Sequence, residues 1–165
     1  MMKILVAPHP ALKKKALPVT AVDDEIRQIL DQMLDTMYQA NGIGLAAPQV
    51  GISKRMLVMD VAETDEAPAP MKLINPIIRK ASDESENYEE GCLSFPKQYA
   101  LVKRPKAVTV DYVDIDGKDQ TLEADGLLAI CVQHEIDHLD GVNFVDHISR
   151  IRRDMIMRRL KKIAS

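Results

Sequence analysis

Two histidines and a glutamate stand together in the segment His134-Glu135-Ile136-Asp137-His138. This H-E-x-x-H pattern puts two imidazoles at positions i and i+4 of a helix, on one face and close enough to share a divalent ion. Glu135 is then available beside the ion as a general acid or base. The segment therefore predicts a metal site, because unpaired imidazoles would be costly to bury in an apolar helix.

A catalytic metal needs a third protein ligand, and its identity separates the families that share this pattern. The sequence matches H-E-x-x-H-x-x-G-x-x-H as far as Gly141, but Phe144 stands where the third histidine should be, which excludes the metzincin class. His147 lies beyond that position, and we interpret it as an exposed residue near the final helix.

The two cysteines are the remaining candidates for the third ligand. Cys131 shares the helix face of the two histidines but lies about 10 Å along the axis from His138, so it suits a pocket wall better than the metal. Cys92 lies in Glu90-Gly91-Cys92-Leu93-Ser94, where Gly91 permits close approach of the backbone. Cys92 is the leading candidate for the third ligand.

The elements that must position these groups follow from periodicity. Residues 23–40 have helical spacing of apolar residues and a stop at Asn41-Gly42. Residues 56–61 and 72–80 are expected to be strands, the second an edge strand because it contains Pro76, with an acidic surface loop over 62–71 between them. Residues 107–113 and 120–124 flank a turn signal and predict a hairpin.

The H-E-x-x-H segment belongs to a second predicted helix, which Asp125 can cap and Gly141 ends. Its first turns are apolar on every side, which indicates burial. A last amphipathic helix is expected from Ser149 onward, with Ile151, Met155, Ile156, Leu160 and Ile163 as its apolar residues. The fold class is therefore α+β, with antiparallel sheets packed around a central buried helix and a C-terminal amphipathic helix.

Length and composition agree with one domain over residues 1–165, because 46% hydrophobic residues suffice for a sizeable core. A net charge of −3 gives no global attraction to DNA or to an anionic membrane. The sequence shows neither a secretory signal nor an apolar run long enough to span a bilayer. We expect a cytoplasmic protein whose cysteines are thiols or metal ligands.

Three segments resemble the peptide deformylase family of the bacterial, Gram-negative-like type. They are Gly42-Ile43-Gly44-Leu45-Ala46-Ala47-Pro48-Gln49, Glu90-Gly91-Cys92-Leu93-Ser94 and Gln133-His134-Glu135-Ile136-Asp137-His138. The resemblance extends over nearly the whole chain. It implies removal of the formyl group from the N-terminal methionine of new polypeptides, with release of formate.

The resemblance also implies roles for residues. Cys92, His134 and His138 would bind the metal, with water as the fourth ligand and Glu135 as general acid and base. The Gln49 amide and the Leu93 backbone N–H would stabilise the oxyanion. Positions that match the family's substrate site are Ile43, Gly44, Tyr88, Gly91, Leu127, Ile130 and Cys131. Tyr99 departs from relatives that carry arginine near the peptide exit.

The resemblance implies that the protein binds one divalent ion. Members of the family are iron enzymes, so the expected ion is Fe2+, and Zn2+, Ni2+ or Co2+ can replace it. Expected partners are formyl-methionyl nascent peptides, and ribosomal RNA or protein for the basic final helix. Its basic residues are Arg150, Arg152, Arg153, Arg158, Arg159, Lys161 and Lys162. The alternatives are a zinc endopeptidase and a structural metal module that binds the ribosome.

Overall fold

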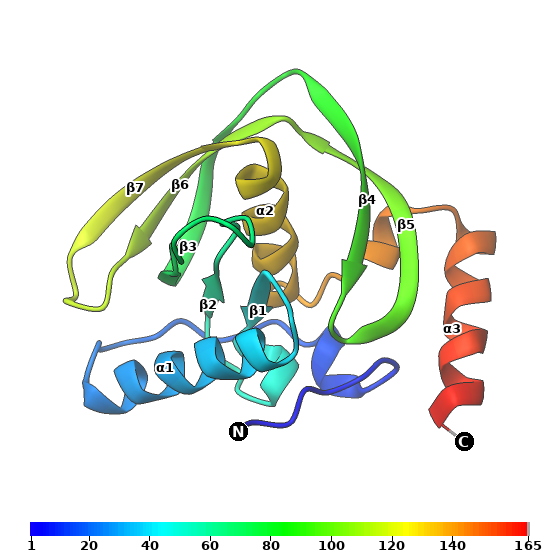
Figure 1. Ribbon diagram of the computed structural model, residues 1–165, viewed down its shortest axis with the longest axis horizontal. Helices are drawn as coiled ribbons and strands as arrows, with labels where there is room; N and C mark the ends of the chain where they lie inside the picture. Colours follow the sequence, from blue (N-terminus) through cyan, green and yellow to red (C-terminus); the bar gives the residue numbers. More distant parts are fainter. Residues whose placement is uncertain (165) are drawn as a thin grey trace.

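The computed structural model describes residues 1–164 as an α+β fold with two antiparallel sheets (Figure 1). The strands are β1 Gly44–Ala46, β2 Met56–Met59, β3 Met71–Ala81, β4 Ser85–Cys92, β5 Phe95–Pro105, β6 Ala107–Val113 and β7 Asp119–Asp125. The α-helices are α1 Asp24–Gln39, α2 Gly126–Leu139 and α3 Arg150–Ala164, and the 3-10 helices are η1 Pro10–Lys13, η2 Ala47–Val50 and η3 Phe144–His147. Antiparallel sheets and a C-terminal helix were both predicted, and both are confirmed.

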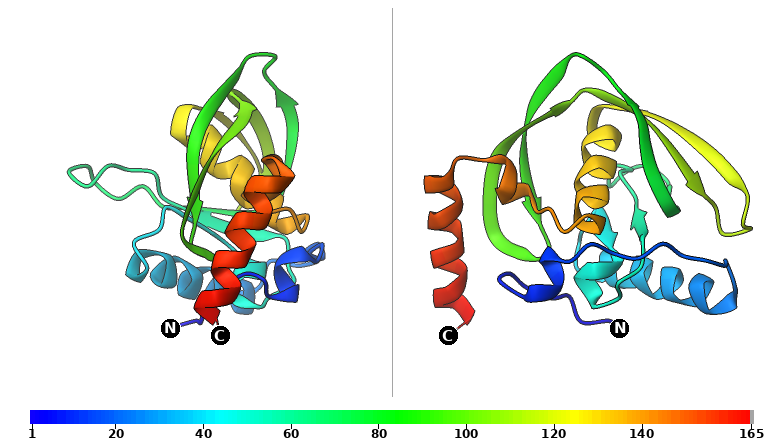
Figure 2. Two further views of the ribbon diagram at one scale, coloured as in Figure 1. Left: turned by 90° about the vertical axis from the view of Figure 1, so that its right-hand side faces the viewer. Right: turned by 180° about the vertical axis from the view of Figure 1, so that it is seen from behind.

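The larger sheet has the strand order β1-β2-β3-β6-β7, and β4 and β5 form a separate two-stranded sheet. Helix α2 stands between the two sheets, α1 crosses below β1 and β2, and α3 lies outside β5 (Figure 1). Figure 2 shows the same arrangement from the side and from behind, with the loop between β2 and β3 extending away from the body. Strands β4 and β5 therefore lie over one side of α2, opposite the larger sheet.

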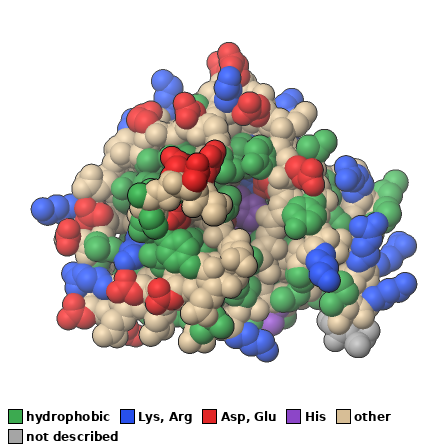
Figure 3. All heavy atoms as spheres, viewed as in Figure 1, with side chains coloured by type: hydrophobic (Ala, Val, Ile, Leu, Met, Phe, Trp, Pro, Cys, Tyr) green, Lys and Arg blue, Asp and Glu red, His purple; other side chains and the backbone are tan. Residues whose placement is uncertain are grey.

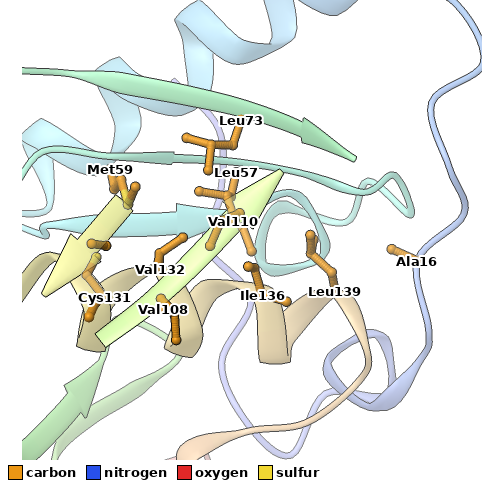
Figure 4. Packing of buried hydrophobic residues seen from close by; sticks show 13 residues of the cluster. Ala16, Leu57, Met59, Leu73, Val108, Val110, Cys131, Val132, Ile136 and Leu139 are labelled. Atoms are coloured by element: carbon orange, nitrogen blue, oxygen red, sulfur yellow. The ribbon is translucent and has the colours of Figure 1, made fainter. Parts of the chain in front are cut away.

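The main core forms where α2 meets the larger sheet, and Figure 4 shows its members. Val132 and Ile136 of α2 pack in one cluster with Val110 of β6. A second cluster lies between α1 and the sheet, and a third joins β5, η3 and α3. Because α2 covers one face of β2 and α1 covers the other, β2 is buried along its whole length, whereas β3 and β6 are buried only in part.

The first helix and the hairpin agree with the predictions. The Asp23 side chain accepts a hydrogen bond from the Ile26 N–H at 3.0 Å and caps α1, and Asn41 after its end has φ 58°. Asp114 Oδ1 accepts hydrogen bonds from the backbone of Asp116 and Lys118 in the turn between β6 and β7. Helical periodicity, the stop at Asn41-Gly42 and turn chemistry were thus sufficient to locate these elements, whereas the Asp23 cap was not predicted.

The expectation that Pro76 marks an edge strand is wrong, because β3 lies in the middle of the larger sheet. Two features accommodate the proline. The ladder with β2 ends at the pair Met56–Ile74, so Pro76 needs no donor on that side, and the register with β6 shifts between Ile74 and Ile77. Proline has no N–H to donate to a neighbouring strand. A bulge that lies beyond the end of the partner strand tolerates this lack as well as an edge strand does.

Three strands were not predicted from the sequence. None of the predicted strands covers residues 44–46, which form β1, or residues 85–92, which form β4 and end at Cys92. Strand β5 does alternate, with Gln98, Ala100, Val102 and Arg104 buried between exposed neighbours. Two of these inward residues, Gln98 and Arg104, are polar, so the sequence of β5 lacks the alternation of apolar and polar residues that predicts a strand.

The ends of the other two helices differ in detail from expectation. Asp125 occupies the N-cap position of α2, but its side chain makes no capping hydrogen bond. Ser149 Oγ accepts from the Arg152 N–H at 3.3 Å at the start of α3, as expected. Of the apolar residues predicted for α3, Ile156 and Leu160 are buried, whereas Ile151, Met155 and Ile163 are exposed. No helix within residues 1–164 has the length and apolar character needed to cross a membrane.

Candidate metal centre and active-site cavity

Cys92, His134 and His138 come together although they belong to two elements far apart in the sequence. One potential ligand atom from each residue lies within 4.8 Å of the others, and Cys92 Sγ is 3.3 Å from His138 Nε2. Metal–ligand bonds of about 2.0–2.3 Å in a tetrahedron place two ligands about 3.3–3.6 Å apart. The end of β4 and one face of α2 therefore form a group that fits a divalent ion.

The outer nitrogen of His134 is held by a buried ion-pair network. His134 Nδ1 lies 2.9 Å from Glu90 Oε1, and Glu90 also accepts two hydrogen bonds from the Arg104 guanidinium. Arg104 Nη1 donates to Asp137 at 2.8 Å, and Asp137 in turn bonds His147. With Nδ1 bound to a carboxylate, His134 directs Nε2 toward the metal position.

The same surroundings separate the pKa values of the two histidines. Burial opposes protonation of His134, but the charge of Glu135 and the bonds to Cys92 and Glu90 outweigh it and raise the His134 pKa well above its ordinary value. Burial and the positive charges of His134 and Arg104 lower the pKa of His138 well below its ordinary value. A metal ion binds the neutral form of each imidazole, so metal affinity at this site depends on pH.

Glu135 has the properties of a general base. It is 4% exposed, and its Oε1 is buried without a hydrogen-bond partner among the described residues. Burial is the main reason that its pKa rises to about 7, opposed by His134 and Arg104 and reinforced by nearby carboxylates. A Cβ at Gly44 would collide with this carboxylate, so a glycine in β1 leaves it room. A base with a pKa near neutrality is suited to proton transfer at physiological pH.

The Gln49 side chain has one orientation. Its Oε1 accepts from the Ala46 N–H at 2.9 Å, so its Nε2 must point the other way. Nε2 donates to Ser94 Oγ at 3.1 Å and lies 3.5 Å from Cys92 Sγ. The amide is thereby a fixed donor beside the metal ligands, which is what stabilisation of an oxyanion requires.

A cavity of about 520 Å³ opens beside this group, and a hollow with histidine atoms inside it is visible in Figure 3. Every predicted substrate residue lines it: Ile43, Gly44, Tyr88, Gly91, Leu127, Ile130 and Cys131. Gln49, Leu93, Cys92, His134 and Glu135 line it as well. His138 is not among the lining residues.

Strands β1 and β4 provide two backbone walls of the cavity. β1 is the end strand of the larger sheet, and β4 pairs with β5 alone. Cys131 Sγ lies 3.6 Å from the Ile43 carbonyl, outside the Cys-His-His group, and burial raises its pKa well above the ordinary value. The Tyr99 ring lies against Gly91, where an added Cβ would be 2.6 Å from it. An extended ligand can therefore run between two strand edges over an apolar base.

Sequence reasoning missed the residues that support this site. Glu90 was within a quoted motif but received no role, and Arg104 and Asp137 were not singled out. A buried arginine between two carboxylates becomes visible only when β4, β5 and α2 are assembled. His147 is exposed, as expected, yet its bond to Asp137 makes it the outer end of the same network.

Comparison with known proteins identifies the family. The family description of polypeptide deformylase matches residues 1–154. The peptide deformylase of Rhizobium meliloti (strain 1021) is 53% identical over 161 residues, covering 98% of this chain and 92% of the relative. That of Agrobacterium fabrum is 54% identical over 161 residues, covering 98% and 95%. The chain belongs to the polypeptide deformylase family.

Solved structures of the deformylase family agree in fold. Peptide deformylase from Ehrlichia chaffeensis has a TM-score of 0.94 at 38% identity, covering 99% of this chain and 96% of that one. The same protein in complex with actinonin has a TM-score of 0.94 at 40% identity, covering 98% and 96%. The family resemblance that the three motifs indicated is thus confirmed, including its Gram-negative type, since most of the curated relatives come from such bacteria.

Proposed function

We propose that this protein hydrolyses the N-formyl amide of formyl-methionyl peptides and releases formate and a free amine. The observation that carries the proposal is the buried, unpartnered Glu135 carboxylate beside a Cys-His-His group at the end of a peptide-sized cavity. A structural metal site usually closes with four protein ligands, whereas this group offers three and a base. Membership of the deformylase family supports the same reaction.

Cys92, His134 and His138 would hold the metal in this proposal. A bound divalent cation would supply a Lewis acid that lowers the pKa of water and polarises the formyl carbonyl. Glu135 takes the proton of the attacking water and later delivers it to the departing amine. The Gln49 amide and the Leu93 N–H donate hydrogen bonds to the oxyanion that develops on the formyl oxygen.

The substrate would bind as an added strand between β1 and β4, with main-chain contacts near Ile43, Gly44 and Gly91. Its first side chain then reaches the apolar base of the cavity. Tyr88, Leu127, Ile130 and Cys131 form that base. An unbranched, polarisable methionine side chain suits such a lining.

We infer that the native metal is Fe2+, by analogy with the family, and that Zn2+, Ni2+ or Co2+ can replace it. A thiolate and two imidazoles bind each of these ions, with zinc held more tightly than ferrous ion by the usual order of affinity. The ligand set therefore does not favour Fe2+ over Zn2+, and the availability of each metal decides which ion is bound.

The whole chain of residues 1–165 acts as one catalytic domain in this proposal, with α2 as its central scaffold. A substrate that exists only on newly made polypeptides places the protein in the cytoplasm. The ribosome is a second proposed partner, because α3 carries seven basic residues in a chain whose net charge is −3. Contacts to ribosomal RNA or protein there would bring formylated N-termini to the cavity.

The test compares a formyl-methionyl tripeptide with the same tripeptide unformylated, using metal-loaded protein. Formate and product masses are both measured. We expect formate from the first peptide and no change in the second. Cleavage of the internal amide bonds would indicate the endopeptidase alternative, and bound metal without either reaction would indicate a structural module.

A further inference from the structure

The two histidines of the metal group differ in what supports them. His134 Nδ1 has Glu90 at 2.9 Å, whereas His138 Nδ1 is buried without a hydrogen-bond partner among the described residues. His138 Nε2 lies 3.3 Å from Cys92 Sγ, so Nδ1 points away from the metal position. A metal-bound histidine almost always donates its second N–H to an oxygen. His138 therefore needs an acceptor.

Asn143 follows α2 and has an unused acceptor of its own. The residue is 5% exposed, and its backbone N–H donates to Asp146 Oδ2 at 2.9 Å. Its Nδ2 donates to the Leu12 carbonyl at 3.4 Å, which assigns the amide orientation and leaves Oδ1 on the other side. Oδ1 is buried without a partner among the described residues. Two buried, complementary atoms thus lack partners in the same part of the fold.

The backbone brings the two residues together. The Val142 N–H donates to the Asp137 carbonyl at 2.9 Å and the Gly141 N–H donates to the His138 carbonyl at 3.2 Å, so the chain folds back onto the last turn of α2 immediately before Asn143. The Asn143 side chain thus lies within hydrogen-bonding reach of the His138 ring.

We propose that Asn143 is a positioning residue for the metal, whose Oδ1 accepts the hydrogen bond of His138 Nδ1–H and so keeps the His138 Nε2 lone pair directed at the ion. The inference rests on the metal site of the proposed function and adds a residue to it. Glu90 gives His134 an anionic partner, while Asn143 gives His138 a neutral one. The Nδ2 of the same amide donates to the Leu12 carbonyl, so Asn143 links His138 to η1 in the N-terminal segment.

A purely structural role is the rival explanation. Asn143 also lines a small cavity of about 10 Å³ beside Pro8, His9 and Arg153, which has room for about one water molecule. In that case Oδ1 would bond this water, and removing it would lower stability without changing how the metal is held.

The experiment measures Zn2+ affinity by competition with a chelator for three variants and the wild type. Asn143→Leu keeps the size and removes the acceptor, and we expect a 10- to 100-fold loss of affinity, roughly the effect of losing such a partner. Asn143→Asp keeps an acceptor and should retain affinity within about threefold. Thr36→Val is the matched control, because Thr36 is a buried polar residue in α1 whose hydroxyl donates to Gln32 O.

Nitrogen NMR of the zinc-loaded wild type gives a second measurement that does not depend on any variant folding. In the wild type we expect His138 as the Nδ1–H tautomer, with a slowly exchanging ring proton. If Asn143→Leu binds Zn2+ as tightly as wild type, or if wild-type His138 carries its proton on Nε2, the inference is overturned while the proposed function stands. If the wild type binds no Zn2+ at all, the metal site itself, and with it the proposed function, is wrong.

Discussion

At the scale of single residues, two thiols face one cavity and only one belongs to the metal group. Cys92 Sγ lies 3.3 Å from His138 Nε2, whereas Cys131 Sγ lies beside the Ile43 carbonyl. The sequence favoured Cys92 by its place on another element and by the axial distance of Cys131 along the helix. The geometry agrees with that preference, although which residue binds the ion stays a prediction.

The cysteine pair gives the first prediction. Cys92→Ala should lower metal affinity by at least about a hundredfold, because it removes a ligand rather than a supporting group. Cys131→Ala should keep full metal content and alter only the binding of the methionine side chain. Metal analysis after gel filtration is the measurement. The assignment of the third ligand is wrong if the two variants behave the other way round.

Glu135 gives the second prediction. Glu135→Ala should retain one metal per chain, because no ligand changes, and should lose at least about a hundredfold in turnover through loss of proton transfer. Turnover is measured on protein whose metal content has been verified. Near-normal turnover in the loaded variant would exclude Glu135 as the general base.

At the scale of elements, the loop between β2 and β3 is held by one carboxylate. Asp60 is 7% exposed and accepts hydrogen bonds from Tyr38 Oη and from the backbone N–H groups of Ala62 and Ala69. Burial acts to raise the pKa of Asp60, but these bonds outweigh it and leave the pKa below its ordinary value. Burial, followed by the bond to Asp60, raises the pKa of Tyr38 to about 12.

The third prediction follows from these two shifts. A lowered Asp60 pKa stabilises the fold above about pH 4, and that contribution is lost as the pH falls through the folded value. A raised Tyr38 pKa stabilises it below about pH 10, and that contribution is lost as the pH rises from there toward about 12. Asp60→Asn should therefore reduce the free energy of unfolding by about 1–3 kcal/mol between about pH 4 and about pH 10.

Urea unfolding of wild type, Asp60→Asn and Tyr38→Phe over this pH range is the measurement. Tyr38→Phe should show a smaller alkaline loss than the wild type, because Tyr112 and Cys131, whose pKa values burial also raises, keep their own contributions. A constant difference between wild type and Asp60→Asn down to pH 2 would show that the charge of Asp60 contributes nothing.

The elements also show what the sequence could and could not predict. Caps and turn residues are local signals, so α1, the hairpin of β6 and β7, and the start of α3 were predictable. Glu90 of β4 and Arg104 of β5 point inward. In the sequence such charged residues suggest an exposed position, and their pairing is evident only when β4, β5 and α2 are assembled. The candidate site residues were found through motifs, but their supporting network depends on tertiary contacts and was missed.

At the scale of the whole molecule, α3 lies outside β5 (Figure 1), and basic and apolar side chains are mixed on that side of the surface (Figure 3). Among residues 150–163 of α3, Ile156 and Leu160 are buried, whereas Ile151 and Met155 are exposed among basic residues. A helix that served only to close the core would not need this surface. Apolar and basic groups together suit a nucleic-acid or protein partner.

The fourth prediction concerns the ribosome. Arg152, Arg158 and Lys161 are exposed, so their joint replacement by glutamine should leave the core intact. We expect weaker cosedimentation with ribosomes, a shallower salt dependence, and unchanged hydrolysis of a short formyl peptide. Replacing Lys13, Lys14 and Lys15, which are exposed elsewhere, is the matched control with the same charge change. If both triple variants and the wild type cosediment equally with ribosomes, the docking proposal is wrong.

The measurement that tests the central claim most directly is formate release as metal is titrated into metal-free protein. Purified apoprotein is supplied with Co2+ or Zn2+ in steps, and formate from a formyl-methionyl peptide is followed at each step. A single metal site formed by Cys92, His134 and His138 predicts that the rate of formate release rises linearly with added metal and stops rising at one equivalent per chain. Formate release that is independent of added metal, or a break at another stoichiometry, would contradict the account.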